Sequence, residues 1–246
     1  MPHHHNKPKQ QYPAPRARAL PSPGGLALLA ATVLLLSGIL LAPIGAAYEA
    51  QQLLKAFEAR WPRKSPRILE NLDELISGAR ASTSDRDRLE HINDFFNRRI
   101  LFEDDESIWG EYDYWATPLE TLATGRGDCE DIAIAKYYAL KAAGVAVSQM
   151  RLIYVRATIE GPRGPQSQAH MVVAWYASPA GEPLILDNLD TRIRPAGERR
   201  DLLPVFSFNS EAIWSGSAGN ARRESGSSEL NRWADLQRRA RAEGFD

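Results

Sequence analysis

The sequence contains a single cysteine among its 246 residues, so the chain cannot form an intramolecular disulfide. It also lacks internal repeats and long low-complexity tracts. Hydrophobic residues make up 43% of the chain and charged residues 25%, and this balance is typical of a globular protein that buries a core. Disorder is therefore not expected for most of the chain.

The chain also carries no excess of positive charge. The first 47 residues hold basic side chains but no acid, so the remainder is more acidic than the whole chain, whose formal net charge is −1. An acidic remainder argues against nucleic acid or anionic lipid as the main partner. The basic residues of this first stretch are Lys7, Lys9, Arg16 and Arg18.

The N-terminal stretch has the pattern of an export signal. An uncharged run at 26–41 is followed by small residues at 45–47, which suit signal-peptidase cleavage after Ala47. Counted over 24–47, the apolar stretch is also long enough to remain as a membrane anchor. Residues 1–47 are therefore predicted to be a signal peptide, which we favour, or an N-terminal anchor. In both cases the rest of the chain is delivered across the membrane.

Helical periodicity dominates the next part of the chain. Apolar residues recur at helical spacing over 48–61, 66–80 and 85–99, which predicts three helices. An acidic and aromatic stretch at 102–115 follows and is expected to be a loop. Thr117-Pro118-Leu119-Glu120 then predicts a short capped helix that stops at Gly125.

The only cysteine lies at a predicted helix start. Gly125-Arg126-Gly127 forms a tight connection into Asp128-Cys129-Glu130-Asp131, and the apolar-periodic segment after it ends at Gly144. Cys129 is therefore expected in the first turn of a helix. The helix dipole at that end stabilises a thiolate.

The second half has the period of β-strands. Runs rich in Val, Ile, Leu and aromatic residues at 151–157, 169–176 and 183–187 predict an antiparallel sheet behind the helices, hence an α+β fold. Residues 48–214 are expected to form the main domain. Residues 215–246 are expected to be a mobile Gly/Ser-rich segment and a last helix from Ser228 to about Glu243, whose arginines face solvent.

A thiol nucleophile needs a base and a group that orients the base. Of the five histidines, three lie in the leader and His91 falls inside a helix, which leaves His170 near the start of a strand. Asp187 closes the next strand, and a hairpin could place its carboxylate beside the imidazole. Because hairpin register cannot be read from the sequence, Asp190 stays open as a substitute. The candidate triad is Cys129, His170 and Asp187.

Asp128, Glu130 and Asp131 surround Cys129 with negative charge. Bare carboxylates would raise the pKa of the thiol, which conflicts with a nucleophilic role. Either these acids cap the helix and complement its dipole, or a hard cation with oxygen ligands binds them. In an ideal helix Glu130 points away from the other two. One ion therefore reaches all three only if Asp128 lies outside the helix, or Glu130 instead binds the ion together with Asp128 and loop carbonyls.

At these residues the sequence resembles a known family, the bacterial transglutaminase-like cysteine proteases of LapG type. The resemblance covers roughly residues 50–214. It rests on Asn93-Asp94-Phe95-Phe96-Asn97-Arg98-Arg99, Asp113-Tyr114-Trp115-Ala116-Thr117-Pro118-Leu119-Glu120, Gly127-Asp128-Cys129-Glu130-Asp131, Gln168-Ala169-His170-Met171-Val172, Leu186-Asp187-Asn188 and Pro204-Val205-Phe206-Ser207-Phe208-Asn209.

The resemblance implies a papain-like, calcium-dependent endopeptidase of the periplasm. Members of the family cut the N-terminal region of a large surface adhesin beside a pair of alanines, which releases the adhesin and disperses biofilm. An inner-membrane receptor for cyclic di-GMP, of LapD type, holds the protease. By position, Cys129 is the nucleophile, His170 the general base and acid, and Asp187 the orienting carboxylate. The ion is expected at Asp128, Glu130 and Asp131.

Two other interpretations of the function remain. The same triad could pass an acyl group to an amine, as in a transglutaminase. A protein that has kept the fold but lost turnover would be a calcium-binding adaptor, although retention of all three triad residues speaks against it. Trp109 and Trp115 could shape the substrate groove or donate an indole N–H to an oxyanion, but packing is the commoner role of such residues.

Overall fold

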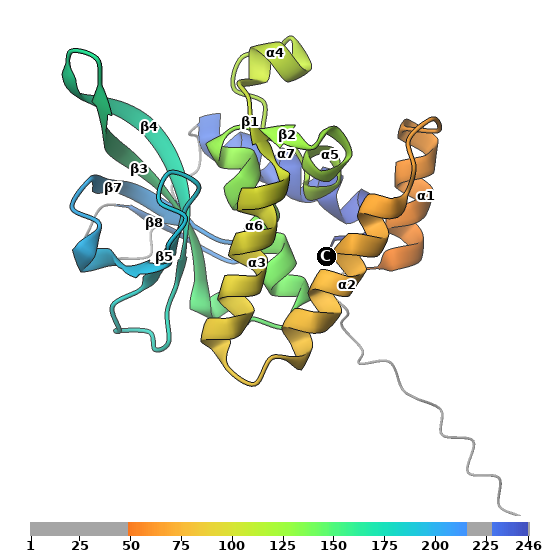
Figure 1. The fold of residues 1–246 in the computed structure, drawn as a ribbon, viewed down its shortest axis with the longest axis horizontal. Coiled ribbons are helices and arrows are strands. Elements are labelled where there is room, and N and C mark those ends of the chain that lie inside the picture. Colours follow the sequence, from red (N-terminus) through yellow and green to blue (C-terminus); the bar gives the residue numbers. More distant parts are fainter. Residues whose placement is uncertain (1–48, 216–227, 246) are drawn as a thin grey trace, which may run out of the picture. The chain divides into compact units, whose positions relative to one another are not determined.

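The computed structural model describes residues 49–215 and 228–245. The expected leader at 1–47 lies outside these ranges, as does most of the Gly/Ser-rich stretch after residue 214. Within the described ranges, no helix is both long and apolar enough to cross a membrane. Helices lie on one side of an antiparallel sheet (Figure 1), so the predicted α+β class is confirmed.

The front half is helical, as predicted. Its three helices are α1 (Ala50–Arg60), α2 (Arg67–Ala81) and α3 (Asp85–Arg99). Their buried residues recur at the expected spacing, for example Leu53 and Phe57 in α1. These apolar faces meet in one core, since burial of such faces is what stabilises short helices.

The centre of the molecule is α6 (Cys129–Ala142), which α5 (Pro118–Thr124) precedes. The predicted capping box is present, because Thr117 accepts from Glu120 N and the Glu120 carboxylate accepts from Thr117 N. Gly125 ends α5 in the left-handed region, with φ of 67°. Nearly every residue of α6 is buried, since the helix packs against both α3 and the sheet. Cys129 is therefore the first residue of a helix that is buried along most of its length.

The acidic and aromatic stretch differs from the predicted loop. It contains a short helix, α4 (Asp105–Trp109), which Asp104 caps at Ser107 N and Gly110 ends. The parallel strands β1 (Leu101–Phe102) and β2 (Arg126–Gly127) hold this stretch next to the start of α6.

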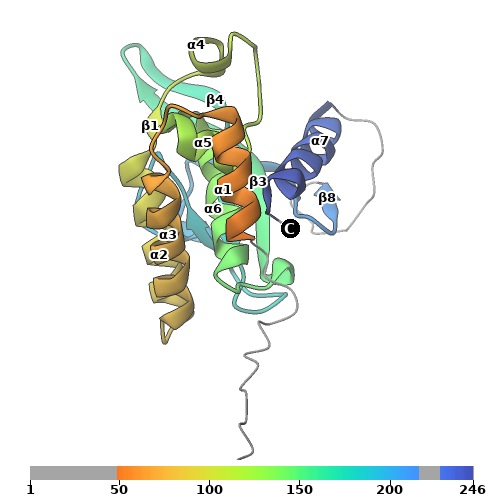
Figure 2. The same ribbon diagram turned by 90° about the vertical axis from the view of Figure 1, so that its right-hand side faces the viewer.

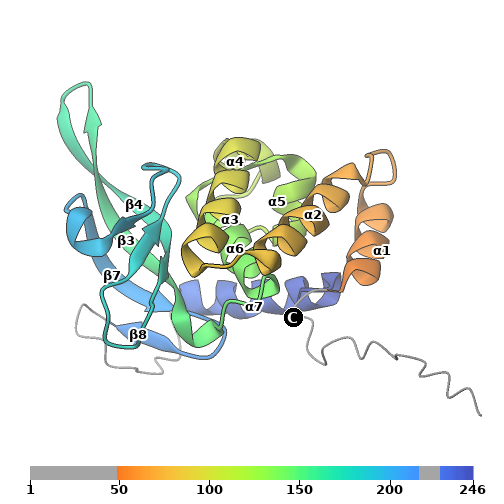
Figure 3. The same ribbon diagram turned by 60° about the horizontal axis from the view of Figure 1, so that its bottom comes forward.

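The main sheet has six strands in the order β6-β5-β4-β3-β7-β8, and every pair is antiparallel. The three predicted strands are confirmed, but the first two are longer than expected and form a hairpin arm that projects from the sheet (Figure 3). The strands are β3 (Met150–Gly161), β4 (Gly164–Trp175), β5 (Leu184–Leu186), β6 (Arg194–Pro195), β7 (Leu202–Phe208) and β8 (Ile213–Ser215).

The C-terminal helix belongs to the same core. The helix α7 (Ser228–Glu243) has the predicted bounds and runs from the sheet towards α1 (Figures 2 and 3). Trp233 and Leu236 are buried, and Trp233 Nε1 donates to Asn209 O at 3.1 Å. The solvated arginine face that the sequence predicts is therefore only partly present. Arg239 pairs instead with the buried carboxylate of Glu120 at 2.8 Å.

Candidate active site and acidic cluster

Cys129 lies in the first turn of α6, as predicted. Asp128 precedes the helix as its N-cap and accepts hydrogen bonds from the backbone N–H groups of Glu130 and Asp131. The thiol donates to Glu130 Oε2 at 2.7 Å. Burial raises the pKa of the Cys129 thiol well above its usual value, and the charges of Glu130 and Asp128 raise it further. In this arrangement the thiol is held in its protonated form.

The backbone N–H of Met171 opposes these effects. It acts as a hydrogen-bond donor to the Cys129 thiol and lowers the pKa of that group. Met171 directly follows His170 in β4, and β4 packs against α6. The fold therefore brings the strand that carries His170 to the end of the helix that carries Cys129.

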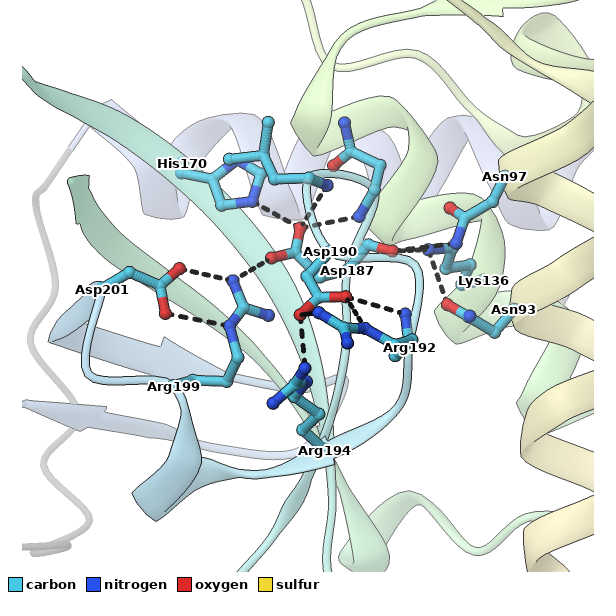
Figure 4. Close-up of polar contacts among 12 residues, drawn as sticks. Asn93, Asn97, Lys136, His170, Asp187, Asp190, Arg192, Arg194, Arg199 and Asp201 are labelled. Atoms are coloured by element: carbon cyan, nitrogen blue, oxygen red, sulfur yellow. Dashed lines mark hydrogen bonds and ion pairs between the residues drawn. The ribbon is translucent and has the colours of Figure 1, made fainter. Parts of the chain in front are cut away.

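His170 and Asp187 form a buried pair (Figure 4). His170 Nε2 lies 2.7 Å from Asp187 Oδ1, and the two residues are only 1% and 2% exposed. Asp187 directly follows β5, which pairs with β4 in the register that the hairpin argument required. The sequence could name the pair, but only the register decides that Asp187 reaches the imidazole.

Asp190, the alternative acid, faces away from His170 (Figure 4). Its carboxylate pairs with Arg192 and Arg194, each at 3.0 Å. These exposed or half-buried arginines hold Asp190 in the loop after β5. Of the two acids, Asp187 is therefore the one that pairs with His170.

Arg199 supports the Asp187 carboxylate, and sequence reasoning missed it. Its Nη2 donates to Asp187 Oδ2 at 2.6 Å, while Asn188 and Leu189 donate backbone N–H groups to Oδ1. Burial acts to raise the pKa of Asp187, but the hydrogen bonds from His170 and Arg199 outweigh it and hold that pKa well below its usual range. Asp187 is therefore an anion that faces the imidazole.

Behind Asp187 lies a second set of polar residues that the sequence did not reveal (Figure 4). Lys136, in the middle of α6, donates to Asp187 O at 3.0 Å and to Asn93 Oδ1 at 2.9 Å. Asn97 donates to the same carbonyl at 2.9 Å, and Asn93 donates to Thr191 O at 2.7 Å. These bonds fix the backbone of the loop after β5. A lysine inside an otherwise apolar helix was the one signal that the sequence offered.

Lys136 is 1% exposed, and burial lowers the pKa of its amine to about 7. A neutral amine keeps two N–H donors, which is the number that Asn93 and Asp187 require. The two acceptors therefore match the neutral form of the buried lysine.

The acids around Cys129 separate into two groups. In the first group, carboxylate oxygens of Asp105, Asp128 and Asp131 lie within 4.8 Å of one another. In the second, the same holds for carboxylate oxygens of Asp128 and Glu130 and the Cys129 sulfur. The structure therefore brings the three predicted metal residues to one region, with Asp128 shared between the groups. Asp105 is the residue that the sequence analysis missed, although its acidic neighbourhood was evident.

Carboxylate oxygens without partners mark the first group as a fit for a cation. Asp105 Oδ1 and Asp131 Oδ2 are buried and have no hydrogen-bond partner among the described residues. Burial, followed by the charge of Asp128, raises the pKa of Asp105 to about 7 and that of Asp131 well above its usual value. Burial and Glu130 raise the pKa of Asp128 to about 8. A hard cation with oxygen ligands would relieve this repulsion.

An acidic cavity of about 310 Å³ adjoins these groups. It lies between the acidic stretch and the β3–β4 arm. Its lining residues are Asp104, Asp105, Glu106, Tyr112, Asp113, Asp128, Glu130, Tyr154 and Ala169.

The two tryptophans of the acidic stretch have different surroundings. Trp115 is buried, stacks on Phe208 with ring centroids 5.8 Å apart, and donates its Nε1 to Asp113 at 3.2 Å. Trp109 packs on Tyr114 at 4.9 Å. Both contacts are those of packing residues, and the indole N–H of Trp115 is already engaged.

The fold, with a cysteine at the start of its central helix beside a buried His–Asp pair, defines a transglutaminase-like cysteine protease architecture. The model of the family described as bacterial transglutaminase-like cysteine proteinase matches residues 71–200. The protein belongs to this family. Among curated proteins, none matches the chain.

Solved structures agree with this assignment. LapG of Legionella pneumophila is 34% identical, and the alignment covers 78% of this chain and 97% of that chain, with a TM-score of 0.62. A calcium-bound structure of LapG from the same organism gives 34% identity, 78% and 98% coverage and a TM-score of 0.63. An EGTA-treated LapG structure gives 33% identity, 78% and 97% coverage and a TM-score of 0.64.

Proposed function

We propose that this protein is a calcium-dependent cysteine endopeptidase in which Cys129, His170 and Asp187 act as the catalytic triad. The observation that carries the proposal is the buried His170–Asp187 pair, with 2.7 Å between Nε2 and Oδ1, on the strand beside the Cys129 thiol. A structural histidine would not need an anionic partner that Arg199 and two backbone N–H groups hold in place.

The role of each His170 ring nitrogen follows from the hydrogen bond to Asp187. Because Asp187 binds Nε2, Nδ1 is the ring nitrogen that takes the thiol proton. The sulfur then attacks the carbonyl carbon of the substrate, and the imidazolium protonates the leaving amine. A water molecule, deprotonated by His170, hydrolyses the acyl-enzyme and restores the thiol.

Helix α6 contributes to this reaction through its N-terminus. Asp128 occupies the N–H groups of Glu130 and Asp131, which leaves the N–H of Cys129 itself as a candidate donor to the oxyanion. The dipole of a 14-residue helix also favours negative charge at this end.

We assign the calcium site to Asp128, Glu130 and Asp131, with Asp105 as a further oxygen ligand. The grouping of these carboxylates and the unpartnered oxygens of Asp105 and Asp131 support this assignment. When bound, the cation supplies positive charge that offsets the carboxylates beside the thiol. The existence of a calcium-bound LapG structure in the same family is consistent with this ion.

The substrate, compartment and partner are proposed from the resemblance. The substrate is the N-terminal region of a large surface adhesin, cut near a di-alanine site, so that the adhesin is released and biofilm disperses. The protease acts in the periplasm, after export by the segment at 1–47. An inner-membrane cyclic di-GMP receptor of LapD type is the proposed regulatory partner.

The deciding experiment is incubation of the purified protein with candidate adhesin N-termini, followed by mass mapping of the products. Cleavage beside paired alanines, dependent on Ca²⁺, is the expected result. Incorporation of a labelled amine in place of hydrolysis would establish a transglutaminase. Binding of Ca²⁺ without either reaction would establish an adaptor.

A further inference from the structure

Strand β4 has one edge that is only partly paired. Along its full length it pairs with β3, from Gly164 to Trp175. On its other side it pairs with β5 over Val173–Trp175 alone. Residues 165–169 are exposed, so in the described chain the outer edge of the β3–β4 arm has no neighbouring strand (Figure 1).

The ladder determines which residues present their backbone groups to this edge. Tyr176 N donates to Gln149 O at 2.8 Å, so even-numbered residues of this strand bond towards β3. Thr158 N donates away from β4, to Asp201 O at 2.8 Å, and Thr158 is the register partner of Ser167. In an antiparallel ladder, the backbone N–H and C=O groups of two register partners either bond to each other or both point away from the pair. Those of Thr158 point away from β4, so those of Ser167 must face the open edge.

The position of Pro165 is consistent with this alternation of inward-facing and outward-facing residues. Proline has no N–H to give to a ladder, and it is tolerated where the missing donor would face solvent. Pro165 has the same parity as Ser167 and Ala169. The N–H and C=O groups of Ser167 and Ala169 therefore point out of the arm.

The open edge leads to the nucleophile. Met171 has the same parity, and its N–H reaches the Cys129 thiol. Ala169, the next residue along the edge, lines the acidic cavity together with Asp128 and Glu130, the two neighbours of Cys129. A chain that follows the edge from Ser167 to Ala169 arrives at the sulfur.

We infer that an extended segment of the polypeptide substrate pairs with the open edge of β4 at Ser167 and Ala169, as an added strand that carries the scissile bond to Cys129. The inference rests on the proposed function and adds how the substrate is held. Main-chain pairing of this kind supplies affinity with little dependence on side chains. Particular substrate side chains are then required only at the positions nearest the Cys129 sulfur.

The test uses proline substitutions on the two edges of the same arm. Ser167→Pro removes an outward N–H on the β4 edge and leaves the β3–β4 ladder intact. Glu160→Pro is the matched control, because Glu160 is exposed, is the register partner of Pro165, and faces outward on the opposite edge. Both variants should keep the far-ultraviolet circular dichroism and the Tm of the parent protein.

Binding is measured in the inactive Cys129→Ala background, so that the readout does not require turnover. The probe is a fluorescein-labelled synthetic peptide of twenty residues with a central Ala-Ala. Loss of one hydrogen bond and the added ring should weaken Kd about tenfold for Ser167→Pro and leave it unchanged for Glu160→Pro. In the active protein the same loss should appear in KM more than in kcat.

Several outcomes would overturn the inference. These are equal affinity of the two proline variants, no binding by the Cys129→Ala protein, and a self-associated state that Ser167→Pro disrupts. Failure of the active protein to cleave, with binding that still depends on the β4 edge, would instead overturn the proposed protease function.

Discussion

His170 binds Asp187 through Nε2, at 2.7 Å from Oδ1, so Nδ1 is the ring nitrogen that the carboxylate leaves free. Arg199 and two backbone N–H groups already hold the Asp187 carboxylate, which therefore cannot turn away from the imidazole without breaking several bonds. The loop after β5 therefore holds the carboxylate that orients the His170 ring.

Substitution of the three proposed triad residues should separate them by role. Cys129→Ala and His170→Ala should each abolish cleavage, because the nucleophile and the base act as a unit. Asp187→Asn should leave a trace, at about 10⁻⁴ of the parent kcat, since it removes the charge and disturbs the tautomer. The measurement is product formation by mass spectrometry on a candidate adhesin N-terminus, with circular dichroism as the control for folding. Near-normal turnover by Cys129→Ala would contradict the protease assignment.

Small residues should be required on both sides of the scissile bond. Replacing either alanine of the substrate pair with Leu should stop cleavage, an expectation that comes from the family resemblance. The measurement compares kcat/KM for the parent peptide and for the two Leu peptides. Substitution with Gly or Ser, which add no bulk, serves as the control. Equal cutting of the Leu peptides would be evidence against a narrow site.

The sequence predicted those parts of the site that depend on local pattern. The capping box at Thr117 and Glu120, the helix start at Cys129 and the strand that carries His170 follow from spacing and turn residues. The choice of Asp187 over Asp190 depended on strand register, which local pattern does not specify.

The supporting residues could not be predicted because they are close only in space. Asn93 and Asn97 contact the loop after β5 from α3, far away in the sequence, and Arg199 reaches Asp187 only because the connection of 12 residues between them folds back. Asp105 joins the acidic cluster because β1 and β2 pair, and strands of two residues leave no readable period. Likewise, the arginines of α7 look solvated until tertiary packing brings Arg239 to Glu120.

Lys136→Met should change stability in a pH-dependent way. Burial lowers the pKa of Lys136 to about 7, whereas the unfolded chain keeps the usual value near 10.5. Between these values the unfolded state binds more protons, so the parent gains stability as pH rises, by up to about 1.4 kcal/mol per pH unit. Below about pH 7 both states are protonated and this gain is absent.

The variant lacks this titration and leaves Asn93 Oδ1 and Asp187 O short of a donor. It should therefore be less stable than the parent above pH 7, and the difference should widen up to about pH 10. Urea unfolding at pH 6, 7.5 and 9 measures the difference. Exposed Lys55→Met is the control for loss of a surface charge. A constant difference across these pH values would show that Lys136 does not titrate in this range.

Removal of calcium should abolish cleavage, and Ca²⁺ should restore it where Mg²⁺ does not, because Mg²⁺ demands a stricter octahedral geometry and gives up its water reluctantly. Asp128→Ala and Glu130→Ala should mimic chelation, since each removes a carboxylate from the groups around Cys129. Asp94→Ala, which removes an acid that pairs with Arg98 on the surface of α3, should leave the calcium response intact.

The thiol itself offers a readout that does not depend on substrate. Glu130 accepts a hydrogen bond from Cys129 at 2.7 Å, and burial together with the charges of Glu130 and Asp128 raises the pKa of the thiol. A bound cation offsets those charges, so the thiolate fraction at a given pH must increase. Alkylation of Cys129 by iodoacetamide at pH 8 should therefore be faster with Ca²⁺ than with EGTA, and Glu130→Ala should lose most of this difference. Two results together would contradict the calcium site: full proteolytic activity in excess EGTA, and alkylation rates that do not depend on calcium. Asp128 would then be only a helix cap, and the acids next to it would only complement the dipole of α6.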